Sequence, residues 1–308
     1  MKEASGCNFL RGKWILYEID RFLQESNILE PIITRELVQQ WRKTRINDAP
    51  STIYNKYSII VQLARFMSRQ GQECYIPRLP EQSRSKCNFT PYIFTRDQID
   101  RILHLSDRLR MYDRHMNNTI FCVPTILRLL YSTGLRISEA LSIKNEDVKF
   151  DKRYILIRKT KNGCERIVPI NDSLFEVLQQ YNSYRDKIPV KNVSSPNSFF
   201  FIKSDGKYCN AQSVYKWFRQ LQTECGIPYT GNHHGPRVHD LRHTFAVHSM
   251  VQLAHEGQDL YSSLPIISVC LGHKSLSATE QYVRLTGEMY PELISQCSTI
   301  NAFMYPKI

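Results

Sequence analysis

The sequence that decides the fold is HDLRHTFAVH, which occupies residues 239–248. His239 and Arg242 are three residues apart, so on a helix their side chains share one face. A guanidinium fork and a titratable imidazole then suit a single bound anion. Zinc is the main alternative, because five histidines lie between residues 233 and 248. The HExxH pattern of zinc-binding helices is absent, however, so we predict no metal ligand and no other cofactor.

An upstream segment, TGLRISEAL at residues 133–141, places a second arginine in a similar setting. Gly134 is predicted to end one helix, and Arg136 then lies at the start of the next. Free N–H groups at a helix N-terminus and a guanidinium can both bind a phosphate. A surface arginine beside a helix cap would show the same pattern, so Arg136 does not establish a site alone.

Between these segments the sequence predicts a β-hairpin. Residues 154–158 and 166–170 have strand patterns, and Asn162-Gly163 favours a turn between them. Lys159 and Lys161 lie near the predicted tip. A lysine there can reach a nucleic-acid groove or give a proton to a leaving oxygen, although a lysine that only improves solubility is common in turns.

Two further candidates lie downstream. Gly272 permits a sharp helix exit that would leave His273 exposed at the turn. Tyr282 follows in a helix whose start is marked by Ser277 and Glu280, spaced as in a capping box. A single tyrosine is usually a packing residue. Together, however, two arginines, two histidines and a lysine could surround one phosphate, which a phenol could attack as a nucleophile.

These segments resemble the tyrosine recombinase family, which includes phage integrases and Xer-type recombinases. The resemblance covers roughly residues 93–290 and, more loosely, the N-terminal segment. TGLRISEAL resembles the first arginine box and KNGCERIVP the β-hairpin, while HDLRHTFAVH and LGHKSLSATEQY resemble the last two boxes. By this resemblance, the catalytic residues are Arg136, Lys161, His239, Arg242, His273 and the nucleophile Tyr282, with Lys159 as a competitor for the lysine.

The resemblance also implies a mechanism. Tyr282 would attack a DNA phosphate, form a 3′-phosphotyrosyl link and free a 5′-hydroxyl. Lys161 would protonate the leaving oxygen, His239 would act as acid and base on the tyrosine side, and His273 would hydrogen-bond the phosphate. The implied enzyme is a site-specific recombinase that works as a homotetramer on two DNA sites, with accessory recombination factors, in integration, excision, transposition or resolution. The alternatives are a type IB topoisomerase-like relaxing enzyme and a non-catalytic DNA-binding protein.

The predicted fold is mainly α-helical with a small β-hairpin, an α+β class. Residues 1–75 have the pattern of a helical bundle, which by resemblance is a SAM-like core-binding domain that clamps DNA. Residues 76–92 predict a linker, because prolines surround a polar stretch. Residues 93–308 would form the catalytic domain, and the segment from about 288 to 308 resembles a tail that docks on a neighbouring protomer.

Helix boundaries follow from capping residues. Thr34 and Ser51 are the expected caps of the second and third helices, and Thr95 with Gln98 forms a capping box. Further helices are expected at residues 120–131, 172–186, 212–224, 239–256 and 265–271.

Two features depart from the family's pattern. An extra polar segment lies near residues 255–259, where we expect a longer helix or a surface loop. The chain ahead of the bundle is too short for an additional arm-binding DNA domain, which favours a simple recombinase.

The charge of the chain predicts a polyanionic partner. There are 41 Lys and Arg residues against 29 Asp and Glu, a formal net charge of +12. Nucleic acid is favoured over a membrane, since no apolar run could span a bilayer and no signal peptide is predicted. A solvated helix face is the simpler interpretation of basic residues in the bundle. The candidate DNA-binding residues are Arg42, Lys43, Arg45, Lys56, Arg65, Arg84, Lys86 and Lys159.

The cysteines indicate the compartment. Nine are present, an odd number without a CxxC pair, which argues against a disulfide framework and a zinc ribbon. We therefore expect a reducing cytoplasm, with the protein associated with the nucleoid.

Overall fold

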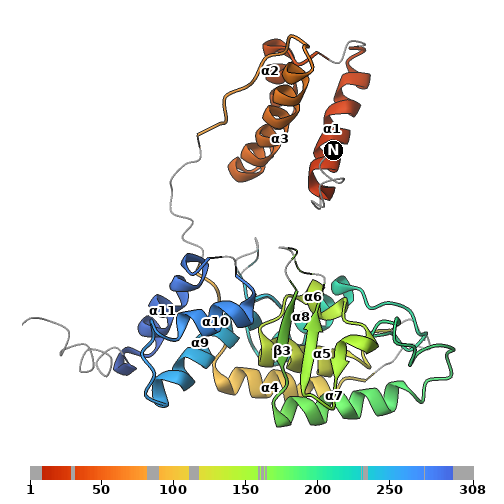
Figure 1. Cartoon of the computed structure of the whole chain (residues 1–308), viewed down its shortest axis with the longest axis vertical. Helices are drawn as coiled ribbons and strands as arrows, with labels where there is room; N and C mark the ends of the chain where they lie inside the picture. The colour runs from red at the N-terminus through yellow and green to blue at the C-terminus, as the bar shows by residue number, and fades with distance from the viewer. Residues whose placement is uncertain are drawn as a thin grey trace, which may run out of the picture. The chain divides into compact units, whose positions relative to one another are not determined.

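The computed structural model describes residues 9–28, 32–81, 90–110, 118–158, 160, 163, 165–229, 231, 235–273 and 275–293. The chain divides into two units, Met1–Asn88 and Phe89–Ile308. Figure 1 labels the α-helices of both units and strand β3. Among the described residues, no helix has the length and apolar composition needed to cross a bilayer.

The described residues of the first unit form three helices, α1 (Leu10–Glu25), α2 (Arg35–Lys43) and α3 (Pro50–Arg69). The Thr34 hydroxyl accepts the N–H of Leu37, which confirms the predicted cap of α2. The predicted cap of α3 is wrong. This helix begins at Pro50, with Ala49 as its N-cap, because proline has a preset φ and lacks the N–H that a first turn leaves unpaired.

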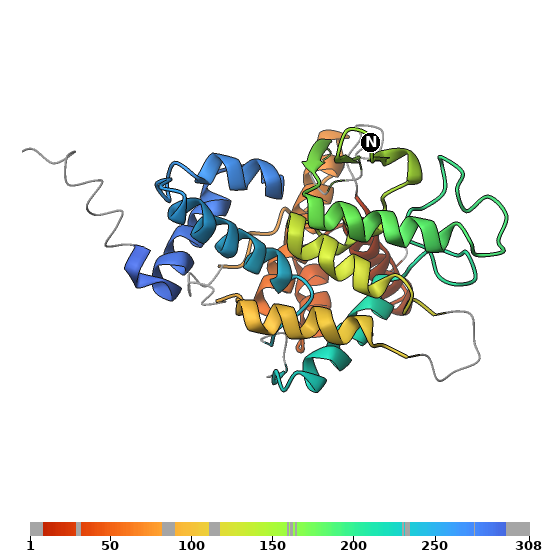
Figure 2. The same ribbon diagram turned by 90° about the horizontal axis from the view of Figure 1, so that it is seen from below.

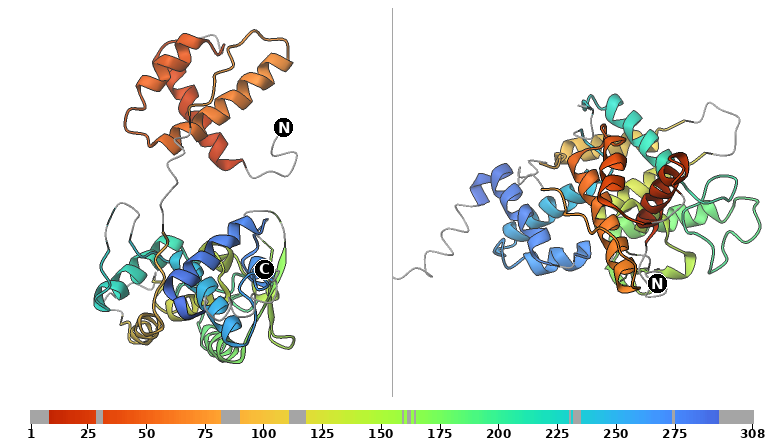
Figure 3. Two further views of the ribbon diagram at one scale, coloured as in Figure 1. Left: turned by 90° about the vertical axis from the view of Figure 1, so that its left-hand side faces the viewer. Right: turned by 90° about the horizontal axis from the view of Figure 1, so that it is seen from above.

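An apolar stripe on each helix holds this first unit together. α1 packs against α3, and the two helices cross in the left-hand view of Figure 3. The buried core of the unit includes Ile33, Val38, Trp41, Ile60 and Ala64.

The second unit begins with four helical elements and a small sheet. The helical elements are α4 (Arg96–Asp107), α5 (Val123–Thr133), α6 (Ile137–Leu141) and the 3-10 helix η1 (Asn145–Asp147). The sheet has the order β1 (Val148–Lys149), β2 (Tyr154–Ile157) and β3 (Arg166–Pro169), all antiparallel. Leu156 pairs with Ile167, so the predicted hairpin strands are confirmed.

Five further helices follow in the described part of the second unit. They are α7 (Asp172–Arg185), α8 (Ala211–Glu224), α9 (Asp240–His255), α10 (Leu264–Leu271) and α11 (Ser277–Met289). A mainly helical chain with one small antiparallel sheet is the fold class that the sequence predicted.

The second unit has two apolar cores, and α9 links them. α5 lies between α4 and α7 in the larger core, as Figure 2 shows. α9, α10 and α11 surround the smaller core, and α9 also packs against α5. The start of α9 therefore lies where the ends of α5 and α10 meet.

Glycines end the two helices that approach this point. Gly134 follows α5 with φ 63°, and Gly272 follows α10 with φ 64°, both in the left-handed region that glycine tolerates. The capping box of Thr95 and Gln98 is confirmed. The second predicted box is wrong, because α11 has Leu276 at its N-cap position without a side-chain cap. Ser277 instead lies 3.0 Å from the hydroxyl of Ser275.

The polar segment after α9 forms a surface turn. α9 ends at His255, and the Asp259 carboxylate accepts the N–H groups of Tyr261 and Ser262. Side-chain capping of this kind stabilises a loop without adding to the core.

Candidate active site

A buried carboxylate organises the first part of the site. Arg136 is the N-cap residue of α6, and its backbone N–H and its guanidinium both donate to Glu139. From β3, Arg166 donates at 2.8 Å to Oε2 of Glu139, the oxygen that also accepts the backbone N–H of Arg136. Burial raises the pKa of Glu139, but the hydrogen bond and charge of Arg166, together with Arg136, outweigh it and hold the pKa below its ordinary value. Glu139 therefore stays ionised between two arginines.

Arg242 of α9 ties two helix ends together. Its Nη1 donates to the carbonyl of Gly134 at 2.7 Å, and its Nη2 donates to that of Leu271 at 2.6 Å. The residue is 2% exposed. Burial, followed by the charge of Arg136, lowers the pKa of Arg242 to about 10, so it remains a cation at neutral pH. A guanidinium has five N–H donors, and carbonyls take two of them here.

Two histidines lie one helical turn apart at the start of α9. The ring of His239 is 5.0 Å from that of His243, in an edge-to-face arrangement. Desolvation by the surrounding protein, and then the charges of Arg242 and Arg237, lower the pKa of His239. Its side chain nevertheless remains accessible to solvent. Burial and then the positive neighbours lower the pKa of His243 to about 3. Both imidazoles are therefore neutral at neutral pH.

The phenol of Tyr282 lies beside these imidazoles. Tyr282 of α11 is 1% exposed, and its hydroxyl lies 2.8 Å from Nδ1 of His243. The ring of His273 is nearly parallel to that of Tyr282, with centroids 6.4 Å apart. Burial raises the pKa of Tyr282, while the charges of Arg242 and Arg136 oppose that rise.

His273 differs from the sequence expectation in its exposure. It was expected to be exposed at the turn, but it is half-buried, and its Nδ1 lies 2.8 Å from the Thr279 hydroxyl. Burial, then Arg242, Arg136 and Arg166, lower the pKa of His273 to about 4.

Five of the six predicted catalytic residues therefore lie within electrostatic reach of one another: Arg136, His239, Arg242, His273 and Tyr282. The sixth, Lys161, and its competitor Lys159 lie outside the described residues. Sequence reasoning missed three contributors. Glu139 lies three residues from Arg136, and His243 lies four residues from His239, both spacings of neighbours on one helix face, whereas no local signal marked Arg166 as part of the site.

A comparison with protein-family models matches residues 93–289 to the phage integrase family. The chain belongs to this family. A protein of Sinorhizobium fredii named integrase/recombinase y4rB is 30% identical over 307 residues, covering 96% of this chain and 92% of that protein. The tyrosine recombinase XerA of Pyrococcus horikoshii is 28% identical over 239 residues, covering 77% and 70%.

A solved structure supports the same fold. The XerH site-specific recombinase bound to palindromic difH substrate, in a post-cleavage complex, has a TM-score of 0.64 and 20% identity, with 91% of this chain and 77% of that chain covered. The resemblance seen in the sequence motifs is confirmed, and the chain is a tyrosine-type site-specific recombinase. These relatives give no support to a relaxing enzyme or a non-catalytic binder.

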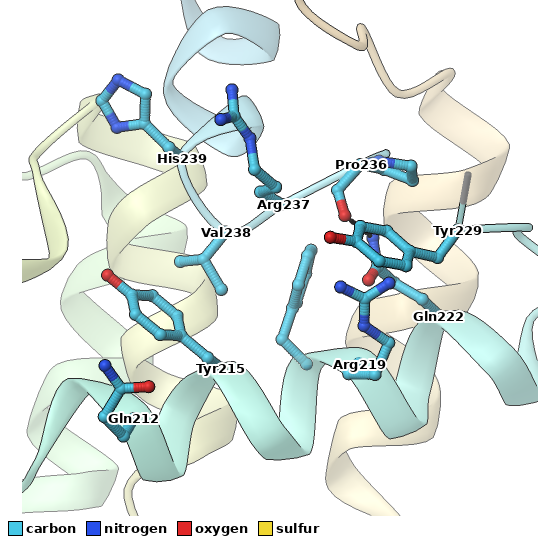
Figure 4. Close-up of a pocket in the computed structure, with 10 residues that line it drawn as sticks. Gln212, Tyr215, Arg219, Gln222, Tyr229, Pro236, Arg237, Val238 and His239 are labelled. Atoms are coloured by element: carbon cyan, nitrogen blue, oxygen red, sulfur yellow. Dashed lines mark hydrogen bonds between the residues drawn. The ribbon is translucent and has the colours of Figure 1, made fainter. Parts of the chain in front are cut away.

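A hollow of about 460 Å³ lies beside His239 in this recombinase. Figure 4 shows Tyr215 and Arg219 rising from α8, with Tyr229, Arg237 and His239 on the opposite side. The Arg219 guanidinium stacks 3.2 Å from the centroid of the Tyr229 ring. The positive charge of the site therefore extends toward α8, a suitable surface for a polyanion.

In the first unit of the recombinase, one predicted DNA ligand is wrong. Lys56 is 8% exposed, and its ammonium binds Glu18 at 2.7 Å and Asp48 at 2.8 Å. A buried lysine between two carboxylates cannot reach a phosphate. Arg45 shares Glu18 at 3.3 Å and is largely committed to the same cluster.

The other basic candidates in this unit vary in exposure. Arg42 donates to the carbonyl of Arg45 and is half-buried. Lys43 and Arg65 are exposed. Arg84 and Lys86 lie outside the described residues. Lys43 and Arg65 are therefore the better candidates for a contact with DNA.

The histidine cluster does not form a metal site within the described ranges, where no three His, Cys, Asp or Glu side chains converge. His239 and His243 have the spacing of metal ligands but contact each other edge-to-face, and His243 is engaged by Tyr282. The arrangement suits phosphate binding and proton transfer.

Proposed function

We propose that this recombinase cuts and rejoins duplex DNA through a 3′-phosphotyrosyl bond at Tyr282. The observation that carries the proposal is the position of the Tyr282 phenol, which is buried among His243, His273 and the charges of Arg242 and Arg136. A phenol placed among cations and neutral imidazoles suits attack on a phosphodiester.

Arg136 and Arg242 would bind the non-bridging oxygens of the scissile phosphate. Their support is stiff, because Glu139 fixes Arg136 and two carbonyls fix Arg242. Donors held in place before the reaction stabilise the charge that develops on the oxygens, and each contributes about 3–4 kcal/mol by analogy with oxyanion-hole donors. His273 would add a hydrogen bond to the same phosphate.

The first chemical step exchanges one phosphate ester for another. The Tyr282 oxygen bonds to phosphorus, the bond from phosphorus to the 5′-oxygen breaks, and Lys161 protonates that oxygen, with Lys159 as the alternative donor. The family resemblance assigns acid and base catalysis on the tyrosine side to His239. The phosphotyrosyl link keeps the bond energy, so a 5′-hydroxyl can rejoin the strand without ATP or a metal ion.

We further propose that the enzyme acts as a homotetramer on two DNA sites, with accessory recombination factors. Ile266 and Val269 of α10 are 52% and 69% exposed, and Leu276 is 48% exposed. An apolar face of this kind is typical of a protein contact. The tail of a neighbouring protomer, including residues 294–308, is the proposed occupant. The first unit would clamp DNA, residues 76–92 would link the two domains, and the protein would act in the cytoplasm on the nucleoid.

Covalent capture on nicked DNA tests the proposal. A pool of random-sequence duplexes carries a nick, so that cleavage close to it releases a short 5′-hydroxyl fragment and traps the protein on the strand. Wild type should give a covalent band on a denaturing gel, and Tyr282→Phe should give none while binding DNA with similar affinity. Capture that persists in Tyr282→Phe would refute the assignment of the nucleophile.

The duplexes selected by capture then separate recombination from relaxation. Wild type should exchange strands between two such duplexes, and native gels should show a four-protomer complex. Relaxation of supercoiled DNA by a monomer, without exchange, would favour the topoisomerase-like alternative.

A further inference from the structure

His243 is the imidazole in contact with the attacking atom. It follows Arg242 on α9, which packs against α11. Its Nδ1 lies 2.8 Å from the Tyr282 hydroxyl, a distance typical of a strong hydrogen bond. Within the described residues, no hydrogen bond joins Tyr282 to His239, whose ring contacts that of His243 instead. His243 therefore stands between His239 and the nucleophile.

We propose that His243 accepts the phenolic proton of Tyr282 during attack, the role that the family resemblance assigns to His239. This inference rests on the proposed function of Tyr282. As the bond from the Tyr282 oxygen to phosphorus forms, the proton moves to Nδ1 of His243, while the bond to the 5′-oxygen breaks. In the rejoining step, His243 returns the proton to the departing phenol. His239 then contacts the ring of His243 and faces the phosphate, and it is not the direct proton acceptor.

The proton state of His243 suits this role. The groups that face it are His239, Arg242 and Arg237 from its own segment, His273 from the turn after α10, and Tyr282 from α11. Burial and then the titratable and cationic groups around it keep the pKa of His243 at about 3, so the imidazole is neutral at neutral pH. In the tautomer that carries its proton on Nε2, Nδ1 is the acceptor that faces the Tyr282 hydroxyl. A bound phosphate brings negative charge to the arginines, which raises the pKa of a nearby imidazole. The base would therefore strengthen when the substrate arrives.

Burial of Tyr282 fits the same sequence of events. Its raised pKa keeps the phenol protonated before DNA binds, so the nucleophile does not repel the phosphate. Proton transfer to an adjacent acceptor then occurs only in the transition state, where such a step contributes about 10²–10⁴-fold in rate.

The first test uses His243→Asn beside His243→Ala, in the full chain. An asparagine oxygen can accept the Tyr282 hydrogen bond near the place of Nδ1, but it cannot take up a proton at neutral pH. We expect single-turnover cleavage of the captured duplex to fall about 10²-fold or more in both variants, with DNA binding unchanged. Near-wild-type cleavage by His243→Asn would show that the contact only positions the phenol, and would overturn the proposal.

A second test changes the acidity of the nucleophile. Incorporation of 3-fluorotyrosine at position 282 gives a more acidic phenol, which needs less help from a base. The fluorine substitution should accelerate cleavage by the His243→Ala variant more than cleavage by wild type, and the rate of this variant should rise with pH. An equal effect in both backgrounds would also overturn the proposal, even if the variants fold less well.

His239→Asn is the matched comparison. If His239 rather than His243 takes the proton, the fluorine effect will be larger in His239→Asn than in His243→Ala, which contradicts the inference. These outcomes are separable from failure of the proposed function. That failure would appear as no covalent capture by wild type, whereas failure of this inference leaves wild-type capture intact.

Discussion

Arg166 offers the sharpest test of how the site is held together. Its guanidinium reaches both oxygens of Glu139, at 2.8 and 3.4 Å, and its Nε donates to the Cys270 carbonyl at 3.3 Å. Glu139 is 1% exposed, so Arg166→Gln would leave a buried carboxylate with Arg136 as its remaining charged partner. Removing one partner of a buried ion pair costs about 3–5 kcal/mol, and the remaining pair puts the expected loss near the lower end, about 3 kcal/mol.

Hydrogen exchange of α5 and β3 amides, followed by mass spectrometry, measures this loss in the second unit alone. Arg153→Gln is the matched control, because Arg153 also pairs with a carboxylate, that of Asp172, but both side chains are substantially exposed. The control should lose less than about 1 kcal/mol. Arg166→Lys keeps the charge without the two-pronged geometry, and should fall between wild type and Arg166→Gln.

The pH dependence separates buried charge from packing. In wild type the pKa of Glu139 is lowered, so the group stabilises the fold above its unfolded pKa and loses this contribution as the pH falls through its folded pKa. Without Arg166, less opposes the effect of burial, so the pKa of Glu139 rises. Protonation of Glu139 at acid pH then removes part of the destabilisation of the variant. The difference in free energy of unfolding between wild type and Arg166→Gln should therefore become smaller as the pH falls from about 7 to about 4. A gap that does not change with pH, or that matches the control, would refute this account.

Three other predictions concern the phosphate site, the first unit and metal dependence. Arg242→Ala should lower single-turnover cleavage by about 10²–10³-fold, because it removes a fixed donor; loss of binding without loss of rate at saturating DNA would contradict this role. Lys56→Met should change the free energy of unfolding of the first unit and leave the salt dependence of DNA binding as it is. Lys43→Ala should instead reduce that salt dependence. Covalent capture should persist in EDTA, whereas loss with chelator and recovery with zinc would revive a metal role for the histidines.

The local sequence predicted the helices and most of the site because its signals are local. Gly134, Gly272 and the capping box of Thr95 act within a few residues, and each lies where the pattern placed it. The failed cap at Ser277 has a local cause as well, since its hydroxyl is engaged by Ser275. Capping patterns therefore predict that a helix is present more reliably than they predict which side chain makes the cap.

The errors and omissions arise where side chains meet across the fold. Arg166 and Glu139 are 27 residues apart, and no spacing rule links a strand to a helix cap at that separation. The burial of Lys56 could be predicted in part from the sequence. It lies three residues after Ile53 and four before Ile60, both buried, and so on the inner face of α3. Only the acidic partners Glu18 and Asp48, supplied by other segments, show why a lysine is tolerated there.

The balance of charge in the site explains several of these observations together. Arg136, Arg166 and Arg242 surround one buried carboxylate, Glu139, while the nearby Asp240 pairs with Arg237. An excess of buried cations destabilises a fold, lowers the pKa values of adjacent imidazoles and favours binding of an anion. A DNA phosphate would offset this excess. The positive field that adds to burial in keeping the histidines neutral would therefore also draw the substrate to Tyr282.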